Sequence, residues 1–361
     1  MKIMIIADNW SSLGKGDIID GLLNTGYEVI CIIPDSGPFN VGENKNLKFY
    51  FMPHNRKKFV PINLKFAVYC LMVYQILKPD KVLMFLSKQT IYVCLAFRFL
   101  KNASISVIIG GLEPLKTKKG IFYKRIYKYI LSYARSVFFV YKDDFDLLDR
   151  YKLGCKERSV LLGSWGVDMD CFIKYPLPQT DLVYMAMPVL CSYGIKCFIE
   201  TAKLVREKYP KVRFLLSGLL NEDPKVLSAQ ELDEACESGA IYYIEVVNDI
   251  KPYLEVCSIF MQPNLSVREG HIIEAEAAGR PILASDHPTN RSLVTEGYNG
   301  FILPVFDAKK WADKIILLLE NKRLKEKLAD YSHELCARMH DRKRIDKLII
   351  ESIKDSIEFK F

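Results

Sequence analysis

Short apolar segments alternate with longer helical segments along the chain, and this alternation restricts the fold more than any other feature. Ile3–Ala7 is followed by turn residues, a helical stretch at Lys15–Asn24 and a second apolar segment at Val29–Ile33. This order is typical of parallel sheets, in which each helix carries the chain back to the start of the next strand. Further strands are expected at Lys81–Phe85, Ile105–Ile109, Val137–Val140 and Val160–Leu162. The chain is therefore predicted to be an α/β protein.

A second set of apolar strands follows a break in the pattern. Its members are Leu182–Ala186, Arg213–Ser217, Ile241–Ile244, Ile259–Gln262, Ile282–Ser285 and Phe301–Leu303. Tyr175-Pro176-Leu177-Pro178 interrupts regular structure between the two sets, and 361 residues suffice for about two domains. We therefore expect two doubly wound parallel sheets, in domains at 1–170 and 171–341. Ligands bind at the carboxyl ends of such strands, so a central cleft between the two sheets is expected.

The composition fits a large α/β enzyme better than a nucleic-acid binder or a membrane-spanning protein. Hydrophobic residues make up 50% of the chain, and 51 Lys and Arg against 43 Asp and Glu give a net charge of only +8. The longest apolar run, Phe66–Leu77, is shorter than the roughly 20 residues that span a bilayer. Ten cysteines without a C-x-x-C pair predict free thiols, and the five histidines show no metal-binding spacing. A cytoplasmic or peripheral protein without a metal is expected.

Residues 269–281 carry the strongest indication of a binding site. Glu269-Gly270 stands before a short helical run, Glu274 lies one turn inside it, and Gly279-Arg280-Pro281 stops it before the next strand. A glycine at a helix entrance lets a ligand approach free N–H groups, which suit an anion such as a diphosphate. The two carboxylates could then accept hydrogen bonds from sugar hydroxyls. A buried amphipathic helix with a glycine C-cap fits the same spacing.

The segments that follow resemble a known family. Pro288–Val294 comes next, then Glu296-Gly297 and the block Asn299-Gly300-Phe301-Ile302-Leu303-Pro304. This order resembles the donor-binding half of glycosyltransferase family 4, the retaining GT-B enzymes. Similar segments occur elsewhere in the chain: Lys78–Val82, Ser87–Tyr92, Ile109–Leu112, Asn248–Ile250, and Gly163–Asp168 with one extra Trp.

The resemblance implies two Rossmann-like domains and a C-terminal helix, within 342–361, that crosses back onto the first domain. It implies that Glu269 binds the donor sugar, that Glu274 binds the nucleotide ribose, and that the amides of Gly270, His271 and Ile272 hold the diphosphate. Asn248 falls in a further donor-side segment. No cofactor is implied beyond the nucleotide sugar as co-substrate, and no metal, because helix dipoles and cations stabilise the leaving group.

One departure concerns the cations that usually hold the diphosphate. The family has an Arg and a Lys after the first strand of the second domain, where this chain has Pro188 and Tyr193. Each charge-assisted contact is typically worth roughly 1.5–3 kcal/mol, so other cations must compensate in an active enzyme. Arg268 is the preferred substitute, with a catalytic role beside Glu269. Lys196 and Lys15 are the other candidates.

The first domain is expected to hold the acceptor. Gly14, Lys15 and Gly16 follow the first strand and could cradle a phosphate, although ordinary turn geometry fits them too. They match neither a P-loop nor a dinucleotide fingerprint. The resemblance adds Lys88, Gly110 and Gly111 as acceptor or phosphate contacts.

Residues 116–129 mix cations with aromatic side chains and could lie on an anionic membrane surface. The alternative is a solvated helix whose apolar stripe packs on its own domain.

The sequence thus favours a retaining glycosyltransferase that moves a hexose or N-acetylhexosamine from a nucleotide sugar, expected to be UDP-linked, to a lipid-linked or oligosaccharide acceptor. Capsule or O-antigen assembly at the inner face of a bacterial plasma membrane is the expected setting. Two alternatives stay open. One is a catalytically degenerate paralogue that acts as a binding or scaffold partner, and the other is a Rossmann-type oxidoreductase, against which the missing dinucleotide fingerprint speaks.

Overall fold

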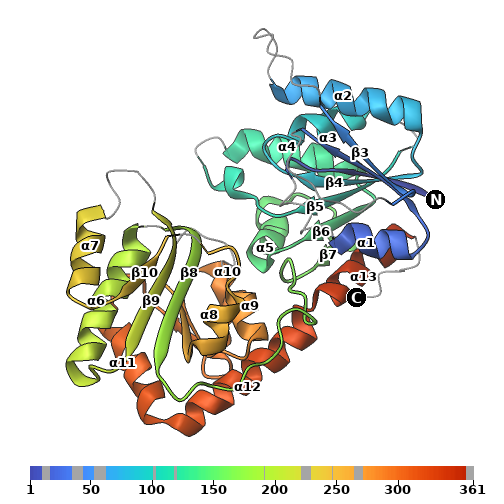
Figure 1. Ribbon diagram of the computed structural model, residues 1–361. Coiled ribbons are helices and arrows are strands. Elements are labelled where there is room, and N and C mark those ends of the chain that lie inside the picture. Colours follow the sequence, from blue (N-terminus) through green and yellow to red (C-terminus); the bar gives the residue numbers. More distant parts are fainter. Residues whose placement is uncertain are drawn as a thin grey trace. The chain divides into compact units, whose positions relative to one another are not determined.

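The computed structural model describes residues 1–9, 17–34, 44–52, 62–100, 103–117, 120–190, 192–220, 229–245, 247–263 and 271–354. The chain forms two compact units. Unit 1 consists of Met1–Trp165 together with Arg342–Phe361, and unit 2 consists of Gly166–Asp341 (Figure 1).

Unit 1 is built on a seven-stranded sheet. Its strand order is β3-β2-β1-β4-β5-β6-β7, and neighbouring strands run parallel. The strands are β1 (Lys2–Ile6), β2 (Glu28–Ile33), β3 (Leu47–Phe51), β4 (Lys81–Leu86), β5 (Ser104–Ile109), β6 (Ser136–Phe139) and β7 (Ser159–Leu161). The helices are α1 (Asp17–Asn24), α2 (Ile62–Leu77), α3 (Ile91–Phe97), α4 (Gly120–Tyr133), α5 (Lys142–Tyr151) and α13 (Arg342–Ile353), with short 3-10 turns η2 (Glu113–Lys116) and η3 (Lys156–Arg158).

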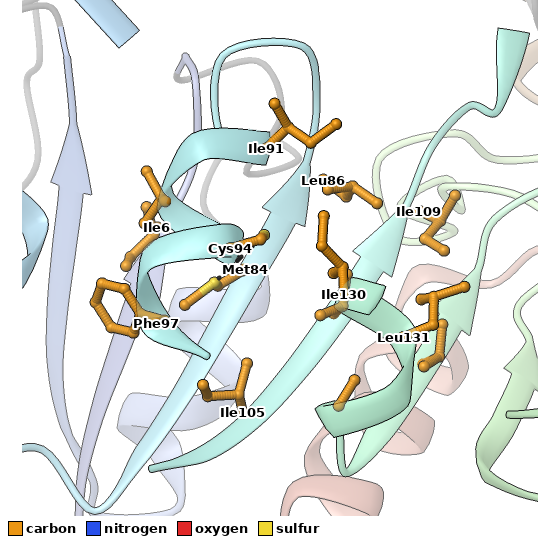
Figure 2. Packing of buried hydrophobic residues seen from close by; sticks show 14 of the residues in the cluster. Ile6, Met84, Leu86, Ile91, Cys94, Phe97, Ile105, Ile109, Ile130 and Leu131 are labelled. Carbon is orange, nitrogen blue, oxygen red and sulfur yellow. Dashed lines mark hydrogen bonds between the residues drawn. The ribbon is translucent and has the colours of Figure 1, made fainter. Parts of the chain in front are cut away.

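Helices cover both faces of this sheet, which is why its central strands are apolar almost throughout. On one face, α2, α3, α4 and α5 pack on side chains such as Met84, Leu86 and Ile109. Figure 2 shows Cys94 and Phe97 of α3 and Ile130 and Leu131 of α4 pointing into this core. On the other face, α1 and α13 share a second core.

Unit 2 repeats the arrangement with six parallel strands. Their order is β10-β9-β8-β11-β12-β13. The strands are β8 (Leu182–Leu190), β9 (Arg213–Leu220), β10 (Tyr242–Ile244), β11 (Ile259–Gln262), β12 (Ile282–Ser285) and β13 (Gly300–Leu303). The helices are α6 (Ser192–Lys208), α7 (Ala229–Glu237), α8 (Lys251–Val256), α9 (Ile272–Ala277), α10 (Pro288–Leu293), α11 (Ala308–Glu320) and α12 (Lys322–Met339).

The two faces of the second sheet are also covered by helices. Residues of α6, α7 and α11 share one core, around the fully buried Trp311. Residues of α8, α9 and α10 share the other, where Leu254, Ile272 and Leu293 meet Tyr184 of β8. Local chemistry marks the helix starts: the Asp307 carboxylate accepts the Lys310 N–H at the start of α11, and the Asn321 amide oxygen accepts the Leu324 N–H at the start of α12.

The prediction of two doubly wound parallel sheets is confirmed. In each sheet the strand order runs outward in both directions from a central pair, β1 and β4 in unit 1 and β8 and β11 in unit 2. Ligands bind beyond the carboxyl ends of such a central pair. The expected cleft between the two sheets stays a prediction.

Two elements differ from the expectations. The strand β3 was missed, and β8 runs to Leu190 rather than ending at Ala186. Proline has no N–H for the ladder, so Pro188 cannot complete a regular pairing at its position. A bulge between Ala186 and Val189 accommodates it instead: Ala186 pairs with Ser217 and Val189 pairs with Leu219, so two residues of β8 stand against Gly218 alone.

Within the part of the chain that the structure describes, no helix is long and apolar enough to cross a membrane. The nine described cysteines are free, and six of them are buried. Cys171 lies exposed in the segment between β7 and β8, and Cys155 and Cys236 are partly buried.

Candidate functional site

Helix α9 is the first helix after β11, which belongs to the central strand pair of unit 2. Arg268, Glu269 and Gly270 lie outside the described residues. His271 is the N-cap residue of α9, and Ile272, its first residue, is fully buried against the sheet. The apolar side chains of this short helix pack against the sheet, and Glu274 lies in its first turn.

One carboxylate oxygen of Glu274 has no hydrogen-bond partner among the described residues. Its side chain is 23% exposed, and Oε1 lies 3.5 Å from Nδ1 of His271. Its Oε2 is buried and has no hydrogen-bond partner in the described part of the chain. A buried acceptor without a donor costs about 1–3 kcal/mol, and more when it is charged. The carboxylate is therefore suited to accept a hydrogen bond from the hydroxyl of a ligand.

A second carboxylate in the same helix has a structural part. Glu276 is fully buried, and its Oε1 accepts a hydrogen bond of 2.9 Å from Nδ2 of Asn299. Asn299, also fully buried, accepts the Thr295 N–H at 2.7 Å, and its backbone oxygen accepts the Ser332 hydroxyl at 3.0 Å. The pair ties α9 to the loop before β13 and to α12. Sequence reasoning missed it, although an acid inside an apolar helix was a usable signal.

Backbone geometry explains other residues of the predicted blocks. A Cβ on Gly300 would lie 2.0 Å from the backbone oxygen of Ile282, so only glycine allows β13 to approach β12 there. Gly279 has φ +70 after the end of α9, a left-handed conformation that favours glycine.

Arg280 is a structural residue. It is fully buried and donates to the backbone oxygens of Cys257, Tyr175 and Pro176 at 2.9, 2.9 and 3.1 Å. Desolvation by burial lowers the pKa of its guanidinium. The side chain joins the segment before β8 to the end of α8.

The two other predicted donor-side residues are exposed. Lys196 lies on the first turns of α6, and its Nζ is 3.5 Å from Oε1 of Glu231 on α7. That exposed pair contributes at most about 1 kcal/mol, so the lysine can leave it for a stronger anion. Asn248 is exposed in the loop between β10 and α8. Both follow the carboxyl ends of strands, at the same edge of the sheet as α9.

Unit 1 contains a pocket of about 270 Å³ at the carboxyl ends of its central strands. Asp8 follows β1, Ser87 and Lys88 follow β4, and Gly110 and Gly111 follow β5, and all five line it. The structure therefore brings together three residues predicted separately, namely Lys88, Gly110 and Gly111. Gly14, Lys15 and Gly16 lie outside the described residues.

Trp165 forms a wall of this pocket that sequence reasoning did not assign. Its indole stacks on Phe85 with ring centroids 5.9 Å apart and planes 13° apart. A Cβ on Gly110 would lie 2.9 Å from Cζ2 of the indole, so the absence of a side chain at Gly110 makes room for it. The signal was the extra Trp in Gly163–Asp168.

A hydrogen bond to a buried carboxylate of helix α5 fixes the turn that follows β5. The backbone N–H of Leu112 donates to Oδ1 of Asp144 at 2.9 Å, and that carboxylate, on α5, is fully buried. This anchor fixes the backbone just after Gly110 and Gly111 and was likewise not expected.

Among the described residues, no group of three or more His, Cys, Asp or Glu side chains could hold a metal ion. The expectation of a metal-independent protein stays a prediction.

The sequence is similar to those of known glycosyltransferases. Residues 181–321 match the family model described as Glycosyl transferases group 1. One similar protein is the N,N'-diacetylbacillosaminyl-diphospho-undecaprenol alpha-1,3-N-acetylgalactosaminyltransferase of Campylobacter jejuni, which is 25% identical over 338 residues, 86% of this chain and 87% of the relative.

Solved structures share the fold over nearly the whole chain. A glycosyltransferase from Rickettsia africae aligns with a TM-score of 0.78 at 16% identity, covering 99% of both chains. Anabaena Alr3699/HepE, solved in complex with UDP, aligns with a TM-score of 0.78 at 15% identity, covering 98% of this chain and 100% of the other. The chain therefore carries a glycosyl transferases group 1 domain in unit 2, and its fold is that of the GT-B glycosyltransferases.

Proposed function

We propose that the protein transfers a hexose or N-acetylhexosamine, with retention of anomeric configuration, from a UDP-linked sugar to a lipid-linked glycan in surface polysaccharide assembly. The observation that carries the proposal is that Oε2 of Glu274, one turn inside α9 at the central strand pair of unit 2, has no partner within the described part of the chain. The relative from Campylobacter jejuni, whose name specifies a diphospho-undecaprenol-linked acceptor, supports the acceptor class. The UDP complex of Alr3699/HepE supports the donor class.

In this proposal unit 2 holds the donor. Glu274 accepts a hydrogen bond from a ribose hydroxyl, which fills the vacant acceptor position of Oε2. Glu269 binds the sugar hydroxyls, and the amides from Gly270 to Ile272 contact the diphosphate. Arg268, Lys196 and Asn248 complete the donor contacts, with Arg268 opposite the charge that develops on the leaving diphosphate.

Unit 1 holds the acceptor. Lys88 supplies a cation at the pocket beyond β1, β4 and β5, which suits the phosphate of a lipid-linked sugar. Gly110 and Gly111 line the same pocket, and we assign their backbone to the same acceptor contact. Gly14, Lys15 and Gly16 belong to the same proposed phosphate contact.

The proposed reaction needs no metal and no general base from the protein. The acceptor oxygen bonds to the anomeric carbon on the face from which the bond to the donor phosphate breaks. The departing phosphate oxygen takes the proton of the acceptor hydroxyl, so the products are the glycoside and the nucleoside diphosphate. The protein contributes positioning and charge stabilisation.

A transfer assay tests the proposal. The purified chain is incubated with a panel of UDP- and GDP-sugars and an undecaprenyl-diphosphate-linked acceptor, and the lipid product is measured by mass spectrometry. Glu274→Gln should lower the rate at subsaturating donor by about ten- to a hundredfold, because a charged acceptor is lost. Glu207→Gln, an exposed residue on α6, is the matched control and should leave the rate unchanged. Equal rates for Glu274→Gln and wild type refute the assignment.

A second candidate is a catalytically degenerate binding partner. It is favoured by Pro188 in the bulge of β8 and by Tyr193 at the start of α6, where the family has an Arg and a Lys. Nucleotide binding without hydrolysis or transfer from any donor in the panel would support this candidate. Turnover in the same panel would exclude it.

The proposed acceptor is attached to a lipid, so we place the protein at the inner face of the plasma membrane, in peripheral contact with anionic headgroups. Residues 116–129 were the expected contact. In the structure, α4 exposes Ile121 and Phe122 beside Arg125 and Lys128, which supports this part of the proposal.

A further inference from the structure

Three adjacent helices of unit 1 expose an unusual number of apolar side chains. Helix α3 packs against α2 and against α4, and all three cover the same face of the sheet (Figure 1). Nine of the nineteen large hydrophobic side chains exposed in the described part of the chain lie on these helices or directly after α3. They are Leu64, Val68, Met72, Ile76, Tyr92, Phe99, Ile121, Phe122 and Tyr129. We name this set, with Arg125 and Lys128, the α2–α4 face.

Helix α2 shows the feature most clearly. Its inward side chains, Phe66, Ala67, Cys70 and Val73, are buried in the core of unit 1. Leu64, Val68, Met72 and Ile76 recur every four residues on the outer side and are exposed, Ile76 to 74%. An outer stripe of this kind adds nothing to the core, and contiguous exposed apolar surface marks an interaction site.

The outer side of α4 continues the stripe. Figure 2 shows Ile130 and Leu131 of α4 turned into the core. Ile121 and Phe122, exposed to 77% and 62%, lie on the opposite side together with Arg125, Lys128 and Tyr129. Phe99, directly after α3, is 79% exposed. The guanidinium of Arg98 lies 5.7 Å from the ring centre of Tyr129 on α4.

The same part of the chain concentrates positive charge. Residues 62–135 contain thirteen lysines and arginines against two acids, Asp80 and Glu113, a net charge of +11, whereas the whole chain carries +8. The remaining residues are therefore slightly acidic. Helices α2, α3 and α4 contain no Asp or Glu at all.

We propose that the α2–α4 face seats the protein on an anionic bilayer surface, with α2 lying in the plane of the interface and inserting its outer stripe. This extends the contact well beyond residues 116–129 and makes α2 the principal anchor. The proposal rests on the proposed function only in taking the membrane as the place of a lipid-linked acceptor.

The combination of groups favours a bilayer over other occupants. Apolar side chains enter the acyl boundary while cations and tyrosines remain among the headgroups. Each cation near an anionic surface contributes about 1 kcal/mol at low salt. A second copy of the chain would place one strongly basic face against another, and like charges oppose such a contact. Duplex nucleic acid would use the cations but would leave the apolar stripe in water.

Vesicle flotation of the full chain tests the proposal. Wild-type protein should float with vesicles containing phosphatidylglycerol and bind pure phosphatidylcholine much more weakly. The triple variant Val68→Ser, Met72→Ser, Ile76→Ser should lose roughly a hundredfold in affinity, because three apolar side chains no longer leave water. The pair Arg125→Ser, Lys128→Ser should lose about fivefold per cation at low salt, and this loss should shrink at high salt.

Matched changes on unit 2 serve as controls. One control set removes three exposed apolar side chains: Leu204→Ser, Tyr242→Ser and Val256→Ser. The other removes two exposed charges: Lys203→Ser and Lys211→Ser. Neither set should alter flotation. Control sets that weaken flotation as much as the variants of the α2–α4 face do, or flotation that ignores the α2 variant, would overturn the proposal. A wild-type dimer in solution that the α2 variant dissociates would assign the face to a second copy instead. Flotation requires no turnover, so its outcome is independent of whether the protein transfers a sugar.

Discussion

Replacing Asn299 tests whether the buried Glu276–Asn299 contact holds the proposed donor helix in place. Asn299→Ala removes the 2.9 Å bond to the Glu276 carboxylate and leaves the Thr295 N–H without its 2.7 Å acceptor. A bond to a carboxylate is worth about 1.5–3 kcal/mol and a neutral one about 1 kcal/mol, so unit 2 should lose about 2.5–4 kcal/mol. Nucleotide affinity should fall as well, because α9 carries Glu274.

Urea unfolding followed through Trp311 measures this loss in unit 2. Trp311 is fully buried there, and Trp10→Phe with Trp165→Phe leaves it as the sole tryptophan reporter. In a Glu276→Gln background, Asn299→Ala should cost about 1 kcal/mol less, because a neutral amide loses less than a carboxylate. The same cost in both backgrounds would refute the role given to the carboxylate.

Asn299→Asp gives a pH-dependent version of the same test. It preserves shape but places a second carboxylate beside Glu276, so the pKa of one of the two is raised in the folded state. The folded protein then binds a proton more tightly than the unfolded chain, and the destabilisation should diminish as the pH falls from 8 to 5. A destabilisation that stays constant over this range would contradict the assigned proximity.

Three further substitutions probe backbone and packing. Gly110→Ala should displace the Trp165 indole and so shift its fluorescence. In a Trp165→Ala background, Gly110→Ala should cost almost no stability, and stability losses that simply add would contradict the contact. Gly300→Ala should lower the urea midpoint of unit 2, because its Cβ would meet the backbone oxygen of Ile282; an unchanged midpoint would show that β13 can move away. Arg280→Met should destabilise unit 2 by about 3–5 kcal/mol, since three buried carbonyls lose their donor, and a loss below about 1 kcal/mol would show that water replaces the side chain.

The strands of both sheets could be predicted because parallel strands covered on both faces are apolar throughout. Ile259–Gln262 and Ile282–Ser285 were predicted with their observed bounds. The strand β3 was missed because Leu47–Phe51 lies at the edge of its sheet, is only partly buried and contains Lys48. Such a segment has neither a continuous apolar run nor a clear alternation.

The candidate sites could be predicted only as motifs along the chain. Lys88 and Gly110 were predicted from separate segments, and parallel topology brings them to one pocket. Contacts between distant residues were beyond prediction: Glu276 lies 23 positions from Asn299, and Asp144 lies 32 positions from Leu112. Such pairs depend on which helix faces which loop, a matter of tertiary packing rather than local pattern.

The most direct test of the central claim is calorimetric binding of UDP to the wild-type chain and to Glu274→Gln. Wild-type protein should bind UDP, and Glu274→Gln should bind it about ten- to a hundredfold more weakly. The reason is that the substitution removes the charged acceptor Oε2, which has no partner among the described residues. Glu207→Gln should bind as the wild type does. Absence of UDP binding, or equal affinity in Glu274→Gln, would contradict a nucleotide site at the start of α9.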